Sequence, residues 1–303
     1  MKKTVFLFLF MFIFGIIFAQ TQQIYIAGGD GDDAVYWLNG RRTVLPRLSE
    51  FASIYAITVS NSSIYAVGND GDDAVYWLNG RRILLPNSRN EAVAMAITIV
   101  GSNIYIVGWD GADAVYWLNG NRTVLPKTGR EAKAYGIAVS GSEIYITGND
   151  GTDAVYWLNG RRIVLPKTST HAITTAILIS GSNVYIVGAD GYDAVYWING
   201  RRRVLPKNRR NESFAGAIGI AISGTNIYIV GNDGDNAVYW INENRTVLPS
   251  MGHEAEAVAI SVSGTNVYIV GIDGYDAVYW LNGRRIVLTS TDDAFAEAIF
   301  IAP

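Results

Sequence analysis

The sequence predicts an all-β fold, a seven-bladed β-propeller, and three observations support this prediction. A unit of about 40 residues recurs seven times, and each unit contains four segments with the composition of β-strands. A period near 40 with four strands is typical of a propeller blade. The first copy also begins at the second strand of the unit and the last copy ends after a first strand, as ring closure requires. The seven units open at Ile24, Ile64, Ile104, Ile144, Val184, Ile227 and Val267.

The second unit illustrates the four strands. Residues 64–68 (IYAVG) and 73–78 (DAVYWL) are rich in β-branched and aromatic residues. The dipeptide Asn79-Gly80 follows and predicts a two-residue hairpin, because a type I′ turn needs positive φ at both central positions. A third strand is expected near residues 81–85, and a fourth near 94–100, which leads into the next unit. The unit therefore predicts an up-and-down antiparallel sheet.

The strand 73–78 is apolar on both faces. Val75 and Trp77 point to one side, and Ala74, Tyr76 and Leu78 point to the other. A sheet with one face in water would alternate apolar and polar residues. The pattern indicates a blade that packs between two neighbouring blades.

The ends of the chain predict how the ring closes. The first copy begins at the second strand of a blade, and residues 297–303 (EAIFIAP) match the first strand of a blade and then stop. We expect this C-terminal strand to complete the N-terminal blade, which protects both edges.

The first 19 residues predict a secretory signal peptide. Lys2 and Lys3 precede an apolar run over residues 4–18, and Ala19 is a small residue at a cleavage position. Residues 20–303 would then form one propeller domain, exported to the periplasm or the extracellular space, with no stable membrane insertion after cleavage. An uncleaved anchor is the alternative, although the run is short for a membrane span.

Composition narrows the partners and the forces that hold the fold. The chain contains no Cys, so an exported form depends on its core alone. The formal net charge is −3, and the Arg pairs are spread over the repeats rather than clustered. Nucleic acid is therefore not an expected partner, and a monomer is the expected state.

Several residues recur in every unit, and a structural role is the expected one. The seven tryptophans are expected to pack between blades, because the strand around them is apolar on both sides. The recurrent Arg of the outermost strand is expected to cover apolar surface, stack on a ring or pair with an acid of the next blade. The seven tryptophans are Trp37, Trp77, Trp117, Trp157, Trp197, Trp240 and Trp280.

Each unit also carries an Asp-Gly pair with a second Asp, or one Asn, three residues after the first Asp. Asp before Gly is ordinary turn chemistry, so no metal or other cofactor is expected. Calcium is the alternative, although Ca²⁺ takes six to eight oxygen ligands. In the first two units these residues are Asp30, Asp33, Asp70 and Asp73.

The positions that differ between copies are the candidate ligand-binding residues, because binding residues are often placed on loops held by a rigid scaffold. One set lies on or beside the loop between the second and third strands, and comprises Trp109, Tyr192, Tyr275, Asn69, Asn149 and Asn232. A second set precedes the innermost strand and is expected at the channel mouth, where it could hold a cation or be a solvated rim. It comprises Glu91, Glu131, His171 and Glu254.

The repeat AVYWLNGRRxVLP…AxAIxVSGSxIYIVGxDG resembles repeats of secreted bacterial β-propeller proteins of uncharacterised function with AVYW-x-NG motifs. The resemblance covers residues 24–303 and implies a propeller, but it transfers no site residue. The sequence contains no nucleophile elbow, HExxH motif or phosphate loop.

Three functional hypotheses follow from these observations. The first is an exported, non-enzymatic propeller that binds a protein, peptide or glycan on its variable loop face. The second is a lectin-like module with several repeated sugar sites, in which multivalency raises avidity. The third is an enzyme with its site at the channel mouth.

Overall fold

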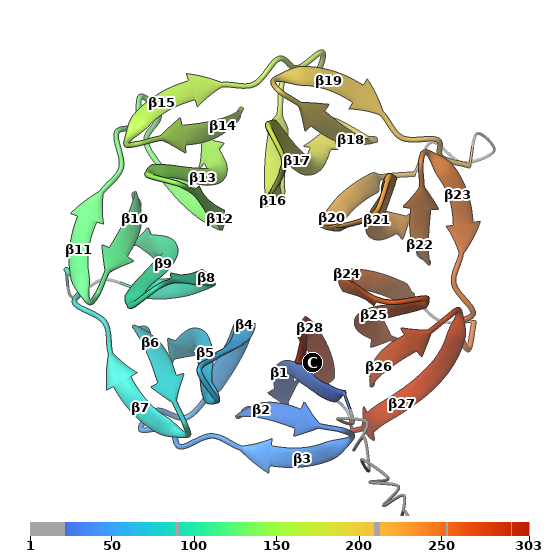
Figure 1. Ribbon diagram of the computed structural model, residues 1–303, viewed down its shortest axis with the longest axis horizontal. Helices are drawn as coiled ribbons and strands as arrows, with labels where there is room; N and C mark the ends of the chain where they lie inside the picture. Colours follow the sequence, from blue (N-terminus) through green and yellow to red (C-terminus); the bar gives the residue numbers. More distant parts are fainter. Residues whose placement is uncertain (1–21, 89–90, 209–212, 253, 292, 303) are drawn as a thin grey trace, which may run out of the picture.

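The computed structural model describes residues 22–302, except 89–90, 209–212, 253 and 292. Figure 1 shows seven four-stranded antiparallel sheets arranged radially in a ring, so the predicted seven-bladed β-propeller is confirmed. The signal peptide predicted for residues 1–19 lies outside the described residues. In the part of the chain that the structure describes, no helix has the length and hydrophobicity needed to cross a membrane.

The strands occupy four radial positions. The innermost strands are β28 (Ala294–Ala302), β4 (Ala52–Ser60), β8 (Ala92–Val100), β12 (Ala132–Ser140), β16 (Ala172–Ser180), β20 (Ala215–Ser223) and β24 (Ala255–Ser263). The second strands are β1 (Gln23–Asp30), β5 (Ser63–Asp70), β9 (Asn103–Asp110), β13 (Glu143–Asp150), β17 (Asn183–Asp190), β21 (Asn226–Asp233) and β25 (Asn266–Asp273). The third strands are β2 (Asp33–Leu38), β6 (Asp73–Leu78), β10 (Asp113–Leu118), β14 (Asp153–Leu158), β18 (Asp193–Ile198), β22 (Asn236–Ile241) and β26 (Asp276–Leu281). The outermost strands are β3 (Arg41–Val44), β7 (Arg81–Leu84), β11 (Asn121–Val124), β15 (Arg161–Val164), β19 (Arg201–Val204), β23 (Asn244–Val247) and β27 (Arg284–Ser290).

Ring closure follows the prediction. The C-terminal strand β28 pairs antiparallel with β1 from Gln23↔Ala302 to Asp30↔Ala294 and forms the innermost strand of the first blade. Neighbouring blades are also joined at the loop face, where for example the Ala92 nitrogen donates to the Asp72 oxygen at 2.8 Å. The two ends of the chain therefore share one sheet and leave no open edge between them.

The Asn-Gly turns between the third and outermost strands have the predicted conformation. Asn79 and Gly80 have φ values of 51° and 81°, as a type I′ turn requires. The Asn79 side chain also accepts a hydrogen bond from the Ile64 nitrogen at 2.8 Å, which ties the turn to the second strand.

The recurrent tryptophans lie between blades, as predicted, and all seven are fully buried. Trp77 is 1% exposed, and its indole nitrogen donates to the Pro46 carbonyl of the preceding blade-to-blade loop at 2.8 Å. Trp37 bonds the Thr289 hydroxyl at 3.2 Å instead, because the last unit has Thr289 where the others have proline. Each indole therefore anchors a blade and also the loop that enters it.

The recurrent Arg pairs with an Asp of its own blade, so one of the three predicted alternatives, a pair with an acid of the next blade, was wrong. Arg82 lies 2.5 Å from Asp70, and both belong to the second blade. The Asp70 carboxylate is fully buried and also accepts from the nitrogens of Leu48 and Ser49. These donors stabilise the ionised form, so the pKa of Asp70 is lowered despite the cost of burial. Each such Asp fixes the loop that enters its blade.

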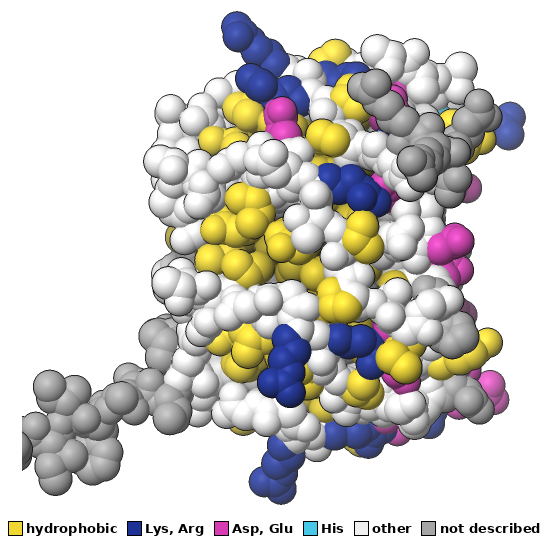
Figure 2. Space-filling view, turned by 90° about the vertical axis from the view of Figure 1, so that its right-hand side faces the viewer, with side chains coloured by type: hydrophobic (Ala, Val, Ile, Leu, Met, Phe, Trp, Pro, Cys, Tyr) yellow, Lys and Arg dark blue, Asp and Glu magenta, His cyan; other side chains and the backbone are white. Residues whose placement is uncertain are grey.

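The outer rim of the ring is mixed in character. Figure 2 shows hydrophobic side chains on the side of the molecule, together with Lys and Arg. Val204, Val247 and Val287 of the outermost strands are among the exposed hydrophobic residues.

Candidate functional site

A β-bulge interrupts every innermost strand at the same position. In β4 the pairing with β5 shifts between Ile54 and Ala56, which leaves Tyr55 unpaired. A bulge inserts one extra residue and redirects its side chain. The corresponding unpaired residues of the seven strands, here called the bulge ring, are Tyr55, Met95, Tyr135, Thr175, Ile218, Val258 and Glu297.

The bulge explains why glycine recurs on the second strand. A Cβ placed on Gly68 would lie 1.8 Å from the Ser53 carbonyl oxygen, and one on Gly108 would lie 1.8 Å from that of Val93. Only glycine lets the bulged backbone approach this closely. The conserved feature of the repeat is therefore the bulge geometry, while the bulged side chain is free to differ between blades.

The bulge ring lines a central cavity of about 540 Å³. Each bulge lies at the fourth residue of a nine-residue strand that starts at the loop face, so the ring lies in the half of the channel nearer the variable loops. Isoleucine occurs two residues after each bulge and forms most of the apolar wall. The isoleucines that line the cavity at this position are Ile57, Ile137, Ile177, Ile220, Ile260 and Ile299.

Glu297 is the single charged residue of the bulge ring. It lies on β28, and the adjoining innermost strand β24 carries Glu256. Burial raises the pKa of Glu297 to about 7, and the Glu256 carboxylate adds to this effect. Burial also raises the pKa of Glu256, with a further contribution from Glu254 at the mouth. This side of the channel therefore carries two neighbouring carboxyl groups, Glu297 and Glu256, and both take up a proton at higher pH than an ordinary glutamate.

Tyr55 faces the same acidic side from β4. Burial raises the pKa of its hydroxyl, and the carboxylates of Glu297 and Glu91 raise it further. Tyr55 therefore stays a neutral hydrogen-bond donor and acceptor at physiological pH.

The opposite side of the channel carries an aromatic and cationic group. The Trp109 ring meets Tyr135 edge-on, with centroids 6.2 Å apart and planes at 67°. The Lys133 ammonium lies 4.4 Å from the Trp109 ring centroid, within cation–π range. Trp109, predicted as a ligand platform, is half-buried and packs beside the channel wall through Tyr135.

The three asparagines predicted as ligand contacts bond the backbone of their own blades. Asn69 is 6% exposed and donates to the Gly71 carbonyl at 2.9 Å, and Asn149 makes the same contact with Gly151 at 3.3 Å. Asn232 accepts from the Gly216 nitrogen at 3.1 Å. These amides shape the loop face, and none of them lines the cavity.

Tyr192 and Tyr275 lie on the turns between second and third strands, 68% and 72% exposed. They do not line the cavity and are available to a partner that covers the loop face.

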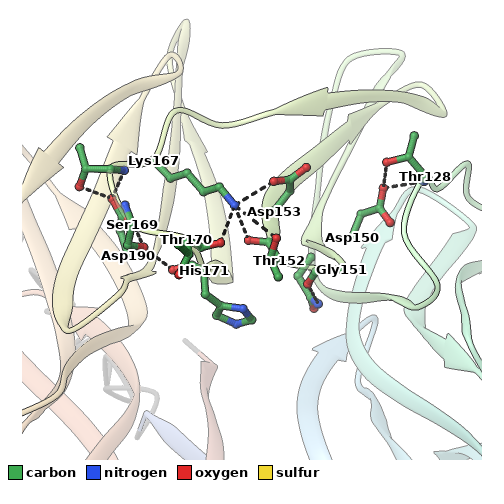
Figure 3. A network of polar contacts seen from close by, with 12 residues as sticks. Thr128, Asp150, Gly151, Thr152, Asp153, Lys167, Ser169, Thr170, His171 and Asp190 are labelled. Carbon is green, nitrogen blue, oxygen red and sulfur yellow. Dashed lines mark hydrogen bonds and ion pairs between the residues drawn. The ribbon is translucent and has the colours of Figure 1, made fainter.

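The second predicted set surrounds the channel mouth rather than its wall. Its members are exposed, and their backbone carbonyls accept from the glycine nitrogen of the Asp-Gly turn in the same blade. Figure 3 shows the His171 ring outside the contacts of the Lys167 and Asp190 network. The four predicted residues are Glu91, Glu131, His171 and Glu254.

The Asp residues considered for calcium are engaged by other groups. Arg42 lies 2.5 Å from Asp30 and 3.5 Å from Asp33, and Arg82 lies 3.2 Å from Asp73. Within the described ranges, no group of three or more His, Asp or Glu side chains is arranged to hold a metal ion.

Figure 3 shows the same chemistry in the fifth blade, where the Asp190 carboxylate accepts from the nitrogens of Thr168 and Ser169. Lys167 donates to the Thr152 and Thr170 carbonyls and pairs with Asp153 at 2.9 Å. These contacts give the loop-face carboxylates a structural role.

Sequence reasoning missed the bulge ring. The aligned copies contained its signal: two variable positions alternate with mostly small residues, as in Ala-x-Ala-x-(Ala/Gly)-Ile, and the second of them is the bulge position. An unbulged strand would place this position on a blade face, so the sequence pattern alone did not direct it to the channel.

Comparisons with known proteins support the fold. No protein-family model matches the chain, and no curated protein matches it. Among solved structures, the computationally designed Ika8 protein is similar over 82% of this chain and 77% of its own, with 17% identity and a TM-score of 0.50. The extracellular domain of the putative one component system BT4673 from B. thetaiotaomicron is similar over 92% of this chain, with 10% identity and a TM-score of 0.54. This chain spans 38% of that second protein.

Proposed function

We propose that this protein is an exported, non-enzymatic, monomeric binding propeller that holds its ligand in the central channel, at the end nearer the loop face. One observation carries the proposal. The blades are nearly identical in their core, turns and ion pairs, and a bulge directs a residue that differs between them into one cavity. A repeat that keeps its scaffold and varies the residues around one cavity is suited to recognition.

The dimensions favour a small ligand or the end of a chain. A cavity of about 540 Å³ falls in the range of small-molecule sites, about 300–1,000 Å³. The exposed Tyr192 and Tyr275 then extend the binding surface on the loop face for a larger partner. Multivalent sugar binding receives less support, because the tryptophan repeated in every blade is buried and cannot stack on a sugar.

The experiment is a ligand screen on the chain from Gln20 to Pro303. Small molecules, peptides and glycans are screened by thermal shift against the parent protein and an Ile218→Trp variant, which fills the cavity from the bulge ring. Val204→Trp on the outer rim is the matched control. We expect ligands that stabilise the parent and Val204→Trp but not Ile218→Trp, and that mass spectrometry recovers unchanged. Ligands that bind Ile218→Trp equally well would place the site elsewhere.

The proposed export is tested separately. Cell fractionation of the full chain and of a Phe8→Asp variant, which interrupts the apolar run, should find only the full chain outside the cytoplasm. Equal distribution of the two forms would refute export through this segment.

A further inference from the structure

We propose that the channel binds a primary ammonium group carried on an apolar body, with Glu297 as its counter-ion. This inference rests on the proposed function and names the ligand class of the same cavity. It is carried by an unpaired carboxylate, a second carboxylate beside it, and an apolar wall around both.

Glu297 differs from the recurrent acids of the chain in having no partner. Every Asp of an Asp-Gly turn has an Arg within 2.6 Å. Glu297 lines the cavity and makes no hydrogen bond or ion pair with any residue that the structure describes. A half-buried carboxylate without a partner loses part of its hydration, and no contact compensates for this loss. A cationic ligand would supply the missing partner.

The groups around Glu297 strengthen its preference for a cation. Glu256 faces it from β24, and Tyr55 faces it from β4. Two acids at the mouth add negative charge next to these groups: Glu254 acts on Glu256, and Glu91 acts on Tyr55. The nearest described cation on an innermost strand is Lys133 of β12, in the fourth blade, which lies three blades from both β28 and β24. Lys133 lies against the Trp109 ring and not against Glu297.

The wall around the carboxylates favours an organic cation over a metal ion. A Ca²⁺ ion takes six to eight oxygen ligands, whereas the bulge ring supplies Met95, Ile218 and Val258 beside the acidic side, and isoleucines line the wall two residues farther along. Tyr55 and Tyr135 add aromatic surface that an apolar or aromatic body can contact. The chemistry is that of an amine with a hydrophobic substituent.

The ammonium group can come from a free amine or from the N-terminus of a peptide. Isothermal titration calorimetry therefore uses 2-phenylethylamine in one arm and the tripeptide Phe-Gly-Gly in the other, each beside its N-acetyl derivative. We expect one or both amines to bind, and both acetylated forms to bind at least tenfold more weakly. Preference between the arms identifies the source, since only the peptide extends beyond the cavity toward the loop face.

Substitution and pH identify the counter-ion. Glu297→Gln should weaken amine binding at least tenfold, whereas Glu143→Gln, an exposed acid at the opposite end of a blade, should leave it unchanged. Binding of 2-phenylethylamine should be about tenfold weaker at pH 6 than at pH 8, because Glu297 with a pKa of about 7 is mostly protonated at the lower pH. Glu297→Gln should remove most of this pH dependence.

The outcomes separate this inference from the proposed function. Equal binding by Glu297→Gln, or no binding of either amine at millimolar concentration, would overturn the amine assignment. If other ligands then lose binding in Ile218→Trp, the channel still functions as a binding site. If no ligand distinguishes Ile218→Trp from the parent, the proposed function itself fails.

Discussion

The half-buried Glu297 should make the stability of the protein depend on pH in a way that one substitution removes. The pKa of Glu297 is raised from 4.5 to about 7 in the folded protein. Between these values the folded state holds a proton that the unfolded state has lost, so the free energy of unfolding falls as pH rises. At about 1.36 kcal/mol per pKa unit, the loss approaches about 3 kcal/mol above pH 7.

The Glu297→Gln variant lacks this titration. Its free energy of unfolding relative to the parent should therefore increase by about 3 kcal/mol between pH 4 and pH 8. The measurement is guanidinium unfolding followed by tryptophan fluorescence at pH 4, 6 and 8. Asp70, Asp150 and Asp190 have lowered pKa values and lose their stabilisation only at more acidic pH, equally in both proteins.

Glu143→Gln serves as the control and should show no such change, because its side chain is exposed. A difference between Glu297→Gln and the parent that stays constant from pH 4 to pH 8 would refute the argument. It would mean that Glu297 titrates near its ordinary pKa and that water reaches it freely.

Four further predictions follow from the scaffold. Arg82→Ala leaves the buried Asp70 charge unpaired and should cost about 3–5 kcal/mol in unfolding experiments, whereas Arg81→Ala at the exposed neighbouring position should stay within about 0.5 kcal/mol. Gly108→Ala would place its Cβ against the bulge carbonyl and should lower the free energy of unfolding by about 3 kcal/mol or more. Gly120→Ala, in open space at positive φ, should lower it by only about 1 kcal/mol. Equal losses in the two variants would contradict the close-approach explanation. A chain ending at Asp293 lacks β28 and should lose its cooperative thermal transition, because β1 becomes an open edge; an unchanged transition would show that closure contributes little. Addition of 5 mM CaCl₂ should leave the melting temperature unchanged, and a rise of several degrees would show that the Asp-Gly loops bind calcium.

The sequence by itself determined the architecture, because every repeat of a propeller contains the same residues that specify a blade. Each unit carries its own strand composition, its Asn-Gly turn and a tryptophan in an apolar strand, so seven copies give seven independent indications of the same blade. The phase offset between the N-terminal strand 24–28 and the C-terminal residues 297–303 also predicted closure, since the strand missing from the first blade matches the strand at the C-terminal end.

The tertiary structure decided which variable residues meet. The sequence pointed to Trp109, the loop asparagines and the acids before the innermost strand, and the structure distributes these between turns, rim and mouth. Glu297 and Tyr55 come together only because a bulge turns each side chain inward and because ring closure places β28 next to β4. Closure joins residues almost the full chain length apart. A pattern within one 40-residue unit contains no information about such a contact. The residues that line the channel could therefore be identified only from the closed ring.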